Sequence, residues 1–128
     1  MICSLSDVKG KTSPCGCHIP KGGLSRQASF LDSVRTAYGQ AFFADAGGYF
    51  PEDDLHQDAA PFLMDAYSLF GIDAVGVGDR DLRFGLAYLR ENARARDLPV
   101  VCANLVDPRT GKPVFPASTV VTRGRVKV

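Results

Sequence analysis

The sequence has little net charge, no long apolar run and few histidines, and each shortage removes a class of function. Its 15 Lys and Arg residues nearly balance its 14 Asp and Glu residues, which leaves a formal net charge of +1. This balance gives no argument for nucleic acid or an anionic membrane surface as a partner. No apolar run reaches the ~18 residues that span a bilayer, so we expect no membrane span. Residues 1–6 are too short and too uncharged a stretch for a signal peptide.

The four cysteines and two histidines are too sparse for an obvious metal-binding motif. Residues 15–18 read Cys15-Gly16-Cys17-His18, with one residue between the cysteines where a c-type haem site has two. A zinc site usually needs four ligands, and only Cys15, Cys17 and His18 are close in sequence. Two interpretations remain open: free or locally oxidised thiols in a loop, or a metal or redox site built on these three residues. Cys3 and Cys102 lie in apolar runs, and we expect them in the core.

A chain of 128 residues, 45% of them hydrophobic, suits one globular domain with an ordinary core. Strand-like and helix-like segments alternate, which predicts an α/β fold with a largely parallel sheet. The spacing of apolar residues predicts strands at 2–6, 41–44, 73–77 and 99–103, helices at 24–38, 58–70 and 82–95, and a hairpin at 119–128. The second helix would bury Phe62, Leu63, Ala66, Leu69 and Phe70. Residues 7–23 form a long loop, whose length is a mild indication of function.

Polar residues follow each predicted strand. They are Asp7, residues 45–48, residues 79–81 and Asn104. Because chemistry in doubly wound α/β folds collects beyond the carboxyl ends of the strands, we expect one site there. Some of these residues also have simpler roles: Asp45 is expected to orient its loop, Asp81 to start a helix or lie on the surface, and Asn104 to cap a turn.

Six segments of the chain occur in an order that resembles a known family. They are Ser6-Asp7-Val8-Lys9-Gly10, Gly22-Gly23-Leu24-Ser25-Arg26, Asp45-Ala46-Gly47-Gly48, residues 78–85, Val101-Cys102-Ala103-Asn104 and Thr110-Gly111-Lys112-Pro113. Each is similar to a signature segment of the calcineurin-like metallophosphoesterases, in the branch that includes the 5'-nucleotidases. The resemblance extends over nearly the whole chain and predicts homology.

The resemblance implies an α-β-β-α sandwich, of which residues 1–128 supply about the first half. It also implies a hydrolase with two divalent ions (Mn, Mg or Zn), a nucleotide or another phosphate monoester as substrate, and an exported or periplasmic location. The two ions would hold the attacking and leaving oxygens of the phosphate. The family's later histidine motifs and its C-terminal nucleotide-binding domain have no counterpart within residues 1–128.

The resemblance is weakest at the metal ligands. Lys9 stands where the family has a histidine, Gly48 where it has a bridging aspartate, and Asp79 and Arg80 where it has Asn-His. By resemblance, Asp7 and Asp79 remain candidate metal ligands, and Asp79 and Arg80 occupy the catalytic positions. A protonated ammonium cannot ligate a metal, and arginine stays protonated near neutral pH. We therefore expect a catalytically impaired domain, with or without a bound metal.

Two interpretations of Lys9 and Arg80 remain open. These cations would neutralise Asp7 and Asp79, since like-charged carboxylates without a counterion are costly to bury. Alternatively, Lys9 and Arg80 would bind an anion such as phosphate, which arginine holds bidentately. The first interpretation needs no ligand, and we favour it.

Two other functions remain open for the whole chain. One is an active hydrolase whose metals are completed by residues outside this chain, and the other is a cysteine-based metal or redox module. Half of a sandwich would leave apolar sheet surface and an unpaired edge strand. We therefore also expect the chain to be a fragment, or to form a homodimer through its open sheet edge.

Overall fold

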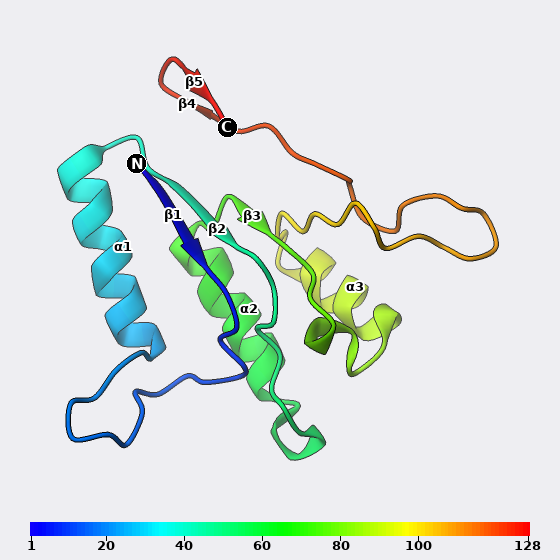
Figure 1. Ribbon diagram of the computed structural model, residues 1–128, viewed down its shortest axis with the longest axis horizontal. Helices are drawn as coiled ribbons and strands as arrows, with labels where there is room; N and C mark the ends of the chain where they lie inside the picture. The colour runs from blue at the N-terminus through cyan, green and yellow to red at the C-terminus, as the bar shows by residue number, and fades with distance from the viewer.

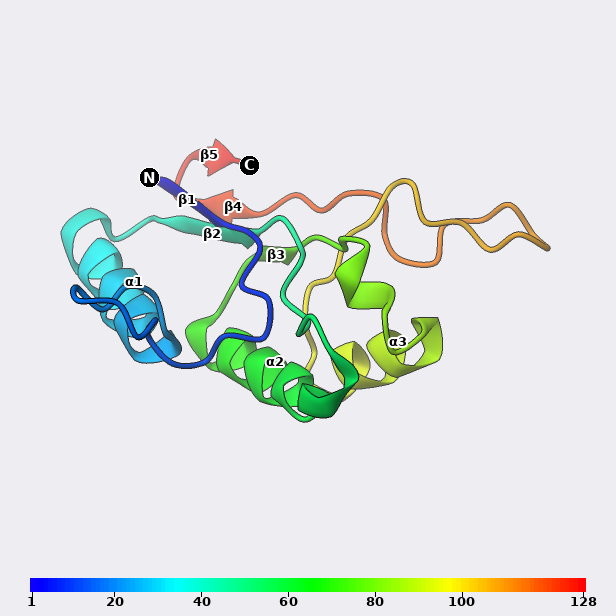
Figure 2. The ribbon, with the colours of Figure 1, turned by 60° about the horizontal axis from the view of Figure 1, so that its bottom comes forward.

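A computed structural model describes residues 1–128 as a parallel sheet with helices packed on one face (Figures 1 and 2). The elements are β1 (Ile2–Leu5), α1 (Leu24–Tyr38), β2 (Phe42–Asp45), η1 (Asp54–His56), α2 (Ala59–Phe70), β3 (Ala74–Val75), η2 (Arg80–Leu82), α3 (Leu86–Ala95), β4 (Thr122–Arg123) and β5 (Val126–Lys127). Strands β1, β2 and β3 are hydrogen-bonded in that order, all parallel. The predicted α/β class with a parallel sheet is confirmed. None of the helices is long and apolar enough to cross a membrane.

The sheet is shorter than the sequence predicts beyond β2. Strand β3 has two residues, and the predicted strand at 99–103 contributes a single parallel bridge between Val75 and Val100. This bridge consists of two hydrogen bonds, from the Val75 N–H to the Pro99 carbonyl at 3.0 Å and from the Val101 N–H to the Val75 carbonyl at 2.9 Å. Pro99 has no N–H for a further bond to β3. The segment therefore adds only this one bridge to the sheet.

The helices begin and end close to the predicted positions, with two corrections. The helix predicted from residue 82 begins at Leu86, because Gly85 has a φ of 87° that breaks it from η2. In α2, the spacing predicted Phe62 and Leu69 on the buried side, but they are 56% and 86% exposed. Leu63 and Ala66 are buried as predicted, and the buried face also carries Ala60, Met64 and Tyr67.

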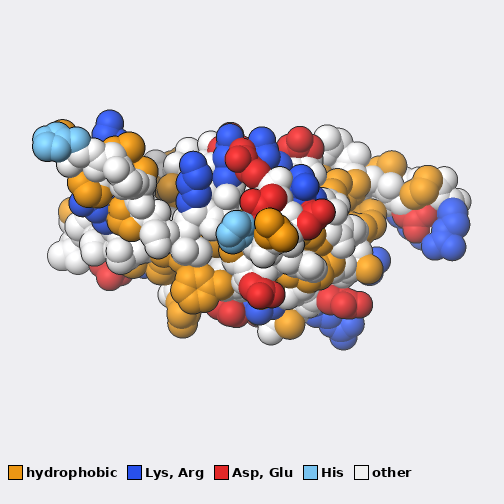
Figure 3. Space-filling model, turned by 90° about the horizontal axis from the view of Figure 1, so that it is seen from below, with side chains coloured by type: hydrophobic (Ala, Val, Ile, Leu, Met, Phe, Trp, Pro, Cys, Tyr) orange, Lys and Arg blue, Asp and Glu red, His pale blue; other side chains and the backbone are white.

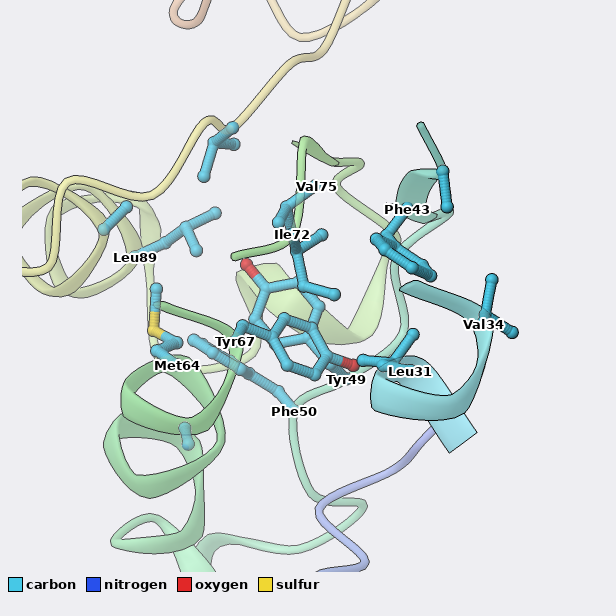
Figure 4. Close-up of a cluster of buried hydrophobic side chains, with 14 residues drawn as sticks. Leu31, Val34, Phe43, Tyr49, Phe50, Met64, Tyr67, Ile72, Val75 and Leu89 are labelled. Carbon is cyan, nitrogen blue, oxygen red and sulfur yellow. The ribbon is translucent and has the colours of Figure 1, made fainter. Parts of the chain in front are cut away.

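The core lies between the sheet and the helices and includes part of the loop that follows β2 (Figure 4). Tyr49 and Phe50 in this loop are fully buried, and their rings meet edge to face with centroids 5.1 Å apart. Tyr67 of α2 packs against Tyr49 with centroids 5.7 Å apart. Edge-to-face aromatic pairs stabilise a core beyond their buried area. This part of the loop therefore belongs to the hydrophobic core.

The β4–β5 hairpin lies beyond the amino ends of the strands of the sheet (Figure 1). Arg123 attaches it: the guanidinium pairs with the Asp73 carboxylate, and its Nε donates to the Ala41 carbonyl at 3.2 Å. Asp73 also accepts the Phe43 N–H at 2.9 Å, so one carboxylate ties the hairpin to β2. Strand β1 is the edge of the sheet; homodimer formation through it stays a prediction.

We expect Arg123→Ala to lower the free energy of unfolding by about 1–3 kcal/mol, because Asp73, whose side chain is 8% exposed, would lose its cation. Denaturant unfolding followed by circular dichroism measures this change. Arg125→Ala is the matched control, since Arg125 is an exposed arginine on the same hairpin. Equal unfolding midpoints for the two variants would contradict the role assigned to Arg123.

Candidate functional site at the carboxyl edge of the sheet

Three loops that follow β1, β2 and β3 meet at the carboxyl edge of the sheet. The first two run side by side through backbone hydrogen bonds: Asp7 N–H to the Gly47 carbonyl at 3.0 Å, Lys9 N–H to the Gly48 carbonyl at 2.9 Å, and Gly10 N–H to the Tyr49 carbonyl at 2.9 Å. These contacts place the predicted segments around Asp7 and Gly48 next to each other. Positive φ values of 60° at Asp7 and 54° at Lys9 bend the first loop onto the second.

The third loop joins the second through one buried carboxylate. Asp81 is fully buried, and its two oxygens accept four backbone N–H groups, those of Gly48 at 2.7 Å, Gly78 at 2.8 Å, Tyr49 at 2.9 Å and Phe50 at 3.0 Å. The prediction that Asp81 lies on the surface is wrong. The sequence did contain a signal for this burial: Asp81 lies in the first turn after a strand, where carboxylates often accept backbone N–H groups.

Asp45 orients the second loop, as its sequence position predicted. It is 2% exposed, and it accepts the Gly47 N–H at 2.7 Å and the Tyr67 hydroxyl at 2.5 Å. Burial raises the pKa of both Asp45 and Asp81, although the hydrogen bonds that each carboxylate accepts oppose the rise. Burial beside these two carboxylates also raises the pKa of the Tyr67 and Tyr49 hydroxyls.

An ion-pair chain, made of Asp7, Lys9, Glu52 and Arg80, crosses the mouth of the three loops. Lys9 Nζ lies 3.6 Å from Asp7 Oδ2 and 3.4 Å from Glu52 Oε1, and Arg80 Nη1 lies 3.4 Å from the same Glu52 oxygen. All four side chains are between 30% and 61% exposed. Figure 3 shows acidic and basic side chains intermingled on this face.

The ion-pair chain agrees with one expectation and corrects another. Lys9 pairs with Asp7, as expected, but the carboxylate beside Arg80 is Glu52 and not Asp79. Adjacent residues of a helical turn point in different directions, so Asp79 and Arg80 diverge. Sequence reasoning missed Glu52 because it lies in an acidic stretch, residues 52–54, that is typical of a solvated helix start.

Asp79, in the third loop, and Asn104, after residues 99–103, lie close together. Both are exposed, and both line a cavity of 240 Å³ with Gly78, Cys102 and three apolar residues, Val77, Leu82 and Leu105. Asn104 Oδ1 is 3.1 Å from the Cys102 thiol, which can donate to it. The predicted core position of Cys102 is confirmed, since it is 8% exposed.

Cys15, Cys17 and His18 lie apart from these residues, in the loop between β1 and α1 (Figure 1). The two histidine side chains of the protein are far apart (Figure 3). No group of three or more His, Cys, Asp and Glu side chains is placed so that it could hold a metal ion.

Comparisons with known proteins show what this chain resembles. Protein UshA of Salmonella pullorum is 30% identical over 117 residues, which cover 83% of this chain and 20% of that protein. The 5'-nucleotidase precursor of Thermus thermophilus has the same fold over 97% of this chain and 26% of its own, with a TM-score of 0.79 and 24% identity. The chain resembles the amino-terminal part of the 5'-nucleotidase family.

The fold of that family is that of the calcineurin-like phosphoesterases. YfkN of Bacillus subtilis, which carries that name, matches 92% of this chain and 40% of its own with a TM-score of 0.75 and 17% identity. No family model matches the chain. The chain spans 20% of the length of UshA.

The resemblance to the 5'-nucleotidases implies a metal centre with a bridging aspartate at the position of Gly48. Gly48 has a φ of 79°, and a Cβ added there would lie 2.6 Å from Asp7 Oδ1. A side chain at residue 48 would therefore require the Asp7 carboxylate to move. Glycine itself has no side chain to bridge two ions, and we derive no reaction step through a metal.

We expect Asp81→Asn to lower the free energy of unfolding by about 2–4 kcal/mol, because the amide would turn an NH₂ group toward backbone N–H groups that lose their acceptor. Urea unfolding gives the difference. Asp79→Asn is the matched control, as Asp79 is two residues away and exposed. A wild-type midpoint for Asp81→Asn would overturn the anchoring role.

The raised pKa of Asp45 gives a stability difference that depends on pH. Since burial favours the protonated carboxyl, the native state binds this proton more tightly than the unfolded chain does. The associated stability is present below the ordinary pKa of 3.8 and is lost as pH rises through the raised value. Asp45→Asn removes the titration, so its stability relative to wild type should increase as pH rises above about 4. Urea unfolding at several pH values measures this; a difference independent of pH would contradict it.

Proposed function

We propose that this chain is part of a metallophosphoesterase-type domain in which an ion-pair chain replaces the two-metal centre, so that the domain does not hydrolyse phosphate esters by the two-metal route. The observation that carries the proposal is the convergence of Lys9 and Arg80 on one oxygen of Glu52, each at 3.4 Å. The loops at the strand ends are joined by backbone hydrogen bonds, by the Asp81 carboxylate and by these ion pairs.

The charges of the ion-pair chain argue against a divalent ion beside it. Two unit charges 4 Å apart interact by about 4 kcal/mol at an effective dielectric constant of 20, and a divalent ion doubles this figure. Lys9 and Arg80 would each repel such an ion. Glu52 is the nearest carboxylate to both cations, and it is engaged by them.

The same contacts argue against phosphate binding by Lys9 and Arg80, because both cations are already paired with carboxylates. Each cation has a carboxylate partner within 3.6 Å, so an incoming phosphate would have to displace Glu52 or Asp7. Pairing within the site therefore supports charge compensation over phosphate binding. Arg80 also cannot serve as a general base, since its guanidinium stays protonated at neutral pH.

A second candidate function is hydrolysis of a nucleotide or another phosphate monoester, as the name 5'-nucleotidase states for one relative, from Vibrio vulnificus. The observation in its favour is the 240 Å³ cavity, which Asp79 and Asn104 both line. Oxygen ligands of this kind suit Mg²⁺ or Mn²⁺ better than zinc. Further ligands would have to come from residues outside this chain.

We expect calorimetric titration of Mn²⁺ into the metal-stripped chain to give no binding at millimolar concentration, and p-nitrophenyl phosphate to remain unhydrolysed in Mn²⁺. The double variant Lys9→His/Arg80→His should bind Mn²⁺ measurably, because it exchanges two cations for two neutral ligands beside Asp7 and Glu52. Lys112→His, on an exposed turn, is the control for an added histidine.

Two ions bound by the wild-type chain at micromolar affinity, with binding lost in Asp79→Ala, would replace the proposal with the second candidate. Titration of inorganic phosphate followed by NMR tests the anion interpretation directly. Shifts of the Lys9 and Arg80 side-chain resonances at millimolar phosphate would overturn charge compensation as their role.

A further inference from the structure

Residues 12–24, from the second part of the loop between β1 and α1 to the first residue of α1, form a closed lobe with its own hydrogen bonds. Its base is held by the Leu24 N–H, which donates to the Thr12 carbonyl at 3.0 Å. Within the lobe, the Cys15 N–H donates to the Lys21 carbonyl at 2.8 Å, and the Lys21 N–H donates to Cys15 Sγ at 3.3 Å. Gly23 lies against Pro14 so closely that an added Cβ would be 2.7 Å from the Pro14 nitrogen. The lobe therefore has a defined shape without help from the sheet.

This lobe carries two cysteines that are separated only by Gly16. Cys15 Sγ accepts the Lys21 N–H at 3.3 Å. Cys17 is exposed and Cys15 is partly exposed, while Gly16 has open space around it. A reagent in solution can therefore reach both sulfur atoms.

The backbone N–H of Lys21 distinguishes the two sulfurs, because it donates to Cys15 Sγ. The neighbouring Cys17 and this N–H lower the pKa of Cys15, while the neighbouring Cys15 raises the pKa of Cys17 and the charge of Lys11 opposes that rise. A donor to Sγ favours a thiolate, so Cys15 is the attacking sulfur and Cys17 is the one that can resolve a bond formed on it.

We propose that Cys15 and Cys17 form a thiol–disulfide exchange site whose substrate is a small, solvent-accessible disulfide. The Cys15 thiolate attacks one sulfur of that disulfide, forms a mixed disulfide and releases one thiolate, which takes a proton from water. Cys17 then loses its proton to water and attacks Cys15 Sγ, forming the Cys15–Cys17 disulfide and releasing the second thiol. The protein dithiol is oxidised by two electrons, and the small disulfide is reduced to two thiols.

A metal site is the weaker use of the same residues. His18 is the one further ligand type next to the two cysteines, and no group of three metal-ligating side chains is placed to hold an ion. Exchange needs two nearby cysteines with access from solvent, and the lobe provides Cys15 and Cys17 one residue apart and at least partly exposed. An exposed disulfide closed over one residue is also readily reduced again, which suits a reversible reaction.

The test uses the reduced full chain with oxidised glutathione as the disulfide, in the presence of EDTA. Peptide mass spectrometry should find a Cys15–Cys17 disulfide in the wild type and a glutathione adduct on Cys15 that accumulates in Cys17→Ser. Cys15→Ser should react about tenfold more slowly at neutral pH, since the remaining thiol is less ionised. Cys3→Ser and Cys102→Ser are the matched controls and should react at the wild-type rate, because these cysteines lie outside the lobe.

A second measurement does not depend on oxidation. Alkylation of the wild type with iodoacetamide at increasing pH should modify Cys15 at a lower pH than Cys17. Equal reaction of the two cysteines, or a wild-type rate in Cys15→Ser, would overturn the proposal. Zinc bound at one ion per chain and lost in His18→Ala would overturn it in favour of a metal site. Because EDTA removes divalent ions, the exchange results are independent of the Mn²⁺ titration.

Discussion

Four backbone N–H groups converge on the carboxylate of Asp81, and this contact fixes the geometry of the strand-end loops. Hydrogen bonds to a charged group each contribute about 1.5–3 kcal/mol, but burial of the charge costs several kcal/mol in return. Burial is the larger effect, so the pKa of Asp81 is raised despite four donors. The contact also requires close backbone approach: a Cβ on Gly47 would lie 2.5 Å from the Gly78 nitrogen. The main effect of Asp81 is therefore to fix the positions of the second and third loops, more than to add net stability.

The ion-pair chain follows from that geometry. With the second loop held by Asp81, the chain leaves the core after Phe50 and carries Glu52 to a place within 3.4 Å of both Lys9 and Arg80. In the proposed function, the ion-pair chain brings opposite charges together where a two-metal centre would do the same. The cations in the ion-pair chain are the side chains of Lys9 and Arg80.

The lobe of residues 12–24, which carries Cys15 and Cys17, has its own hydrogen bonds and its own reactive groups, distinct from those at the carboxyl edge of the sheet. It is closed by its own backbone hydrogen bonds and reaches solvent, whereas the strand-end loops are tied to the aromatic core through Tyr49 and Phe50. Loops on a rigid scaffold often carry function that the scaffold itself does not determine. The fold therefore supports a surface reaction at Cys15 and Cys17 whether or not the strand-end site binds a metal.

The sequence by itself determined the alternation of strands and helices, the bounds of α1 and the order of family segments, since these depend on local periodicity and local motifs. It also placed Asp45 correctly, because a carboxylate directly after a buried strand has few other roles. Tertiary structure alone decided that Asp81 is buried, that Glu52 joins Lys9 to Arg80, and that residues 99–103 leave the sheet. Each of these depends on partners that are distant in the chain, and no periodicity of the sequence records such contacts.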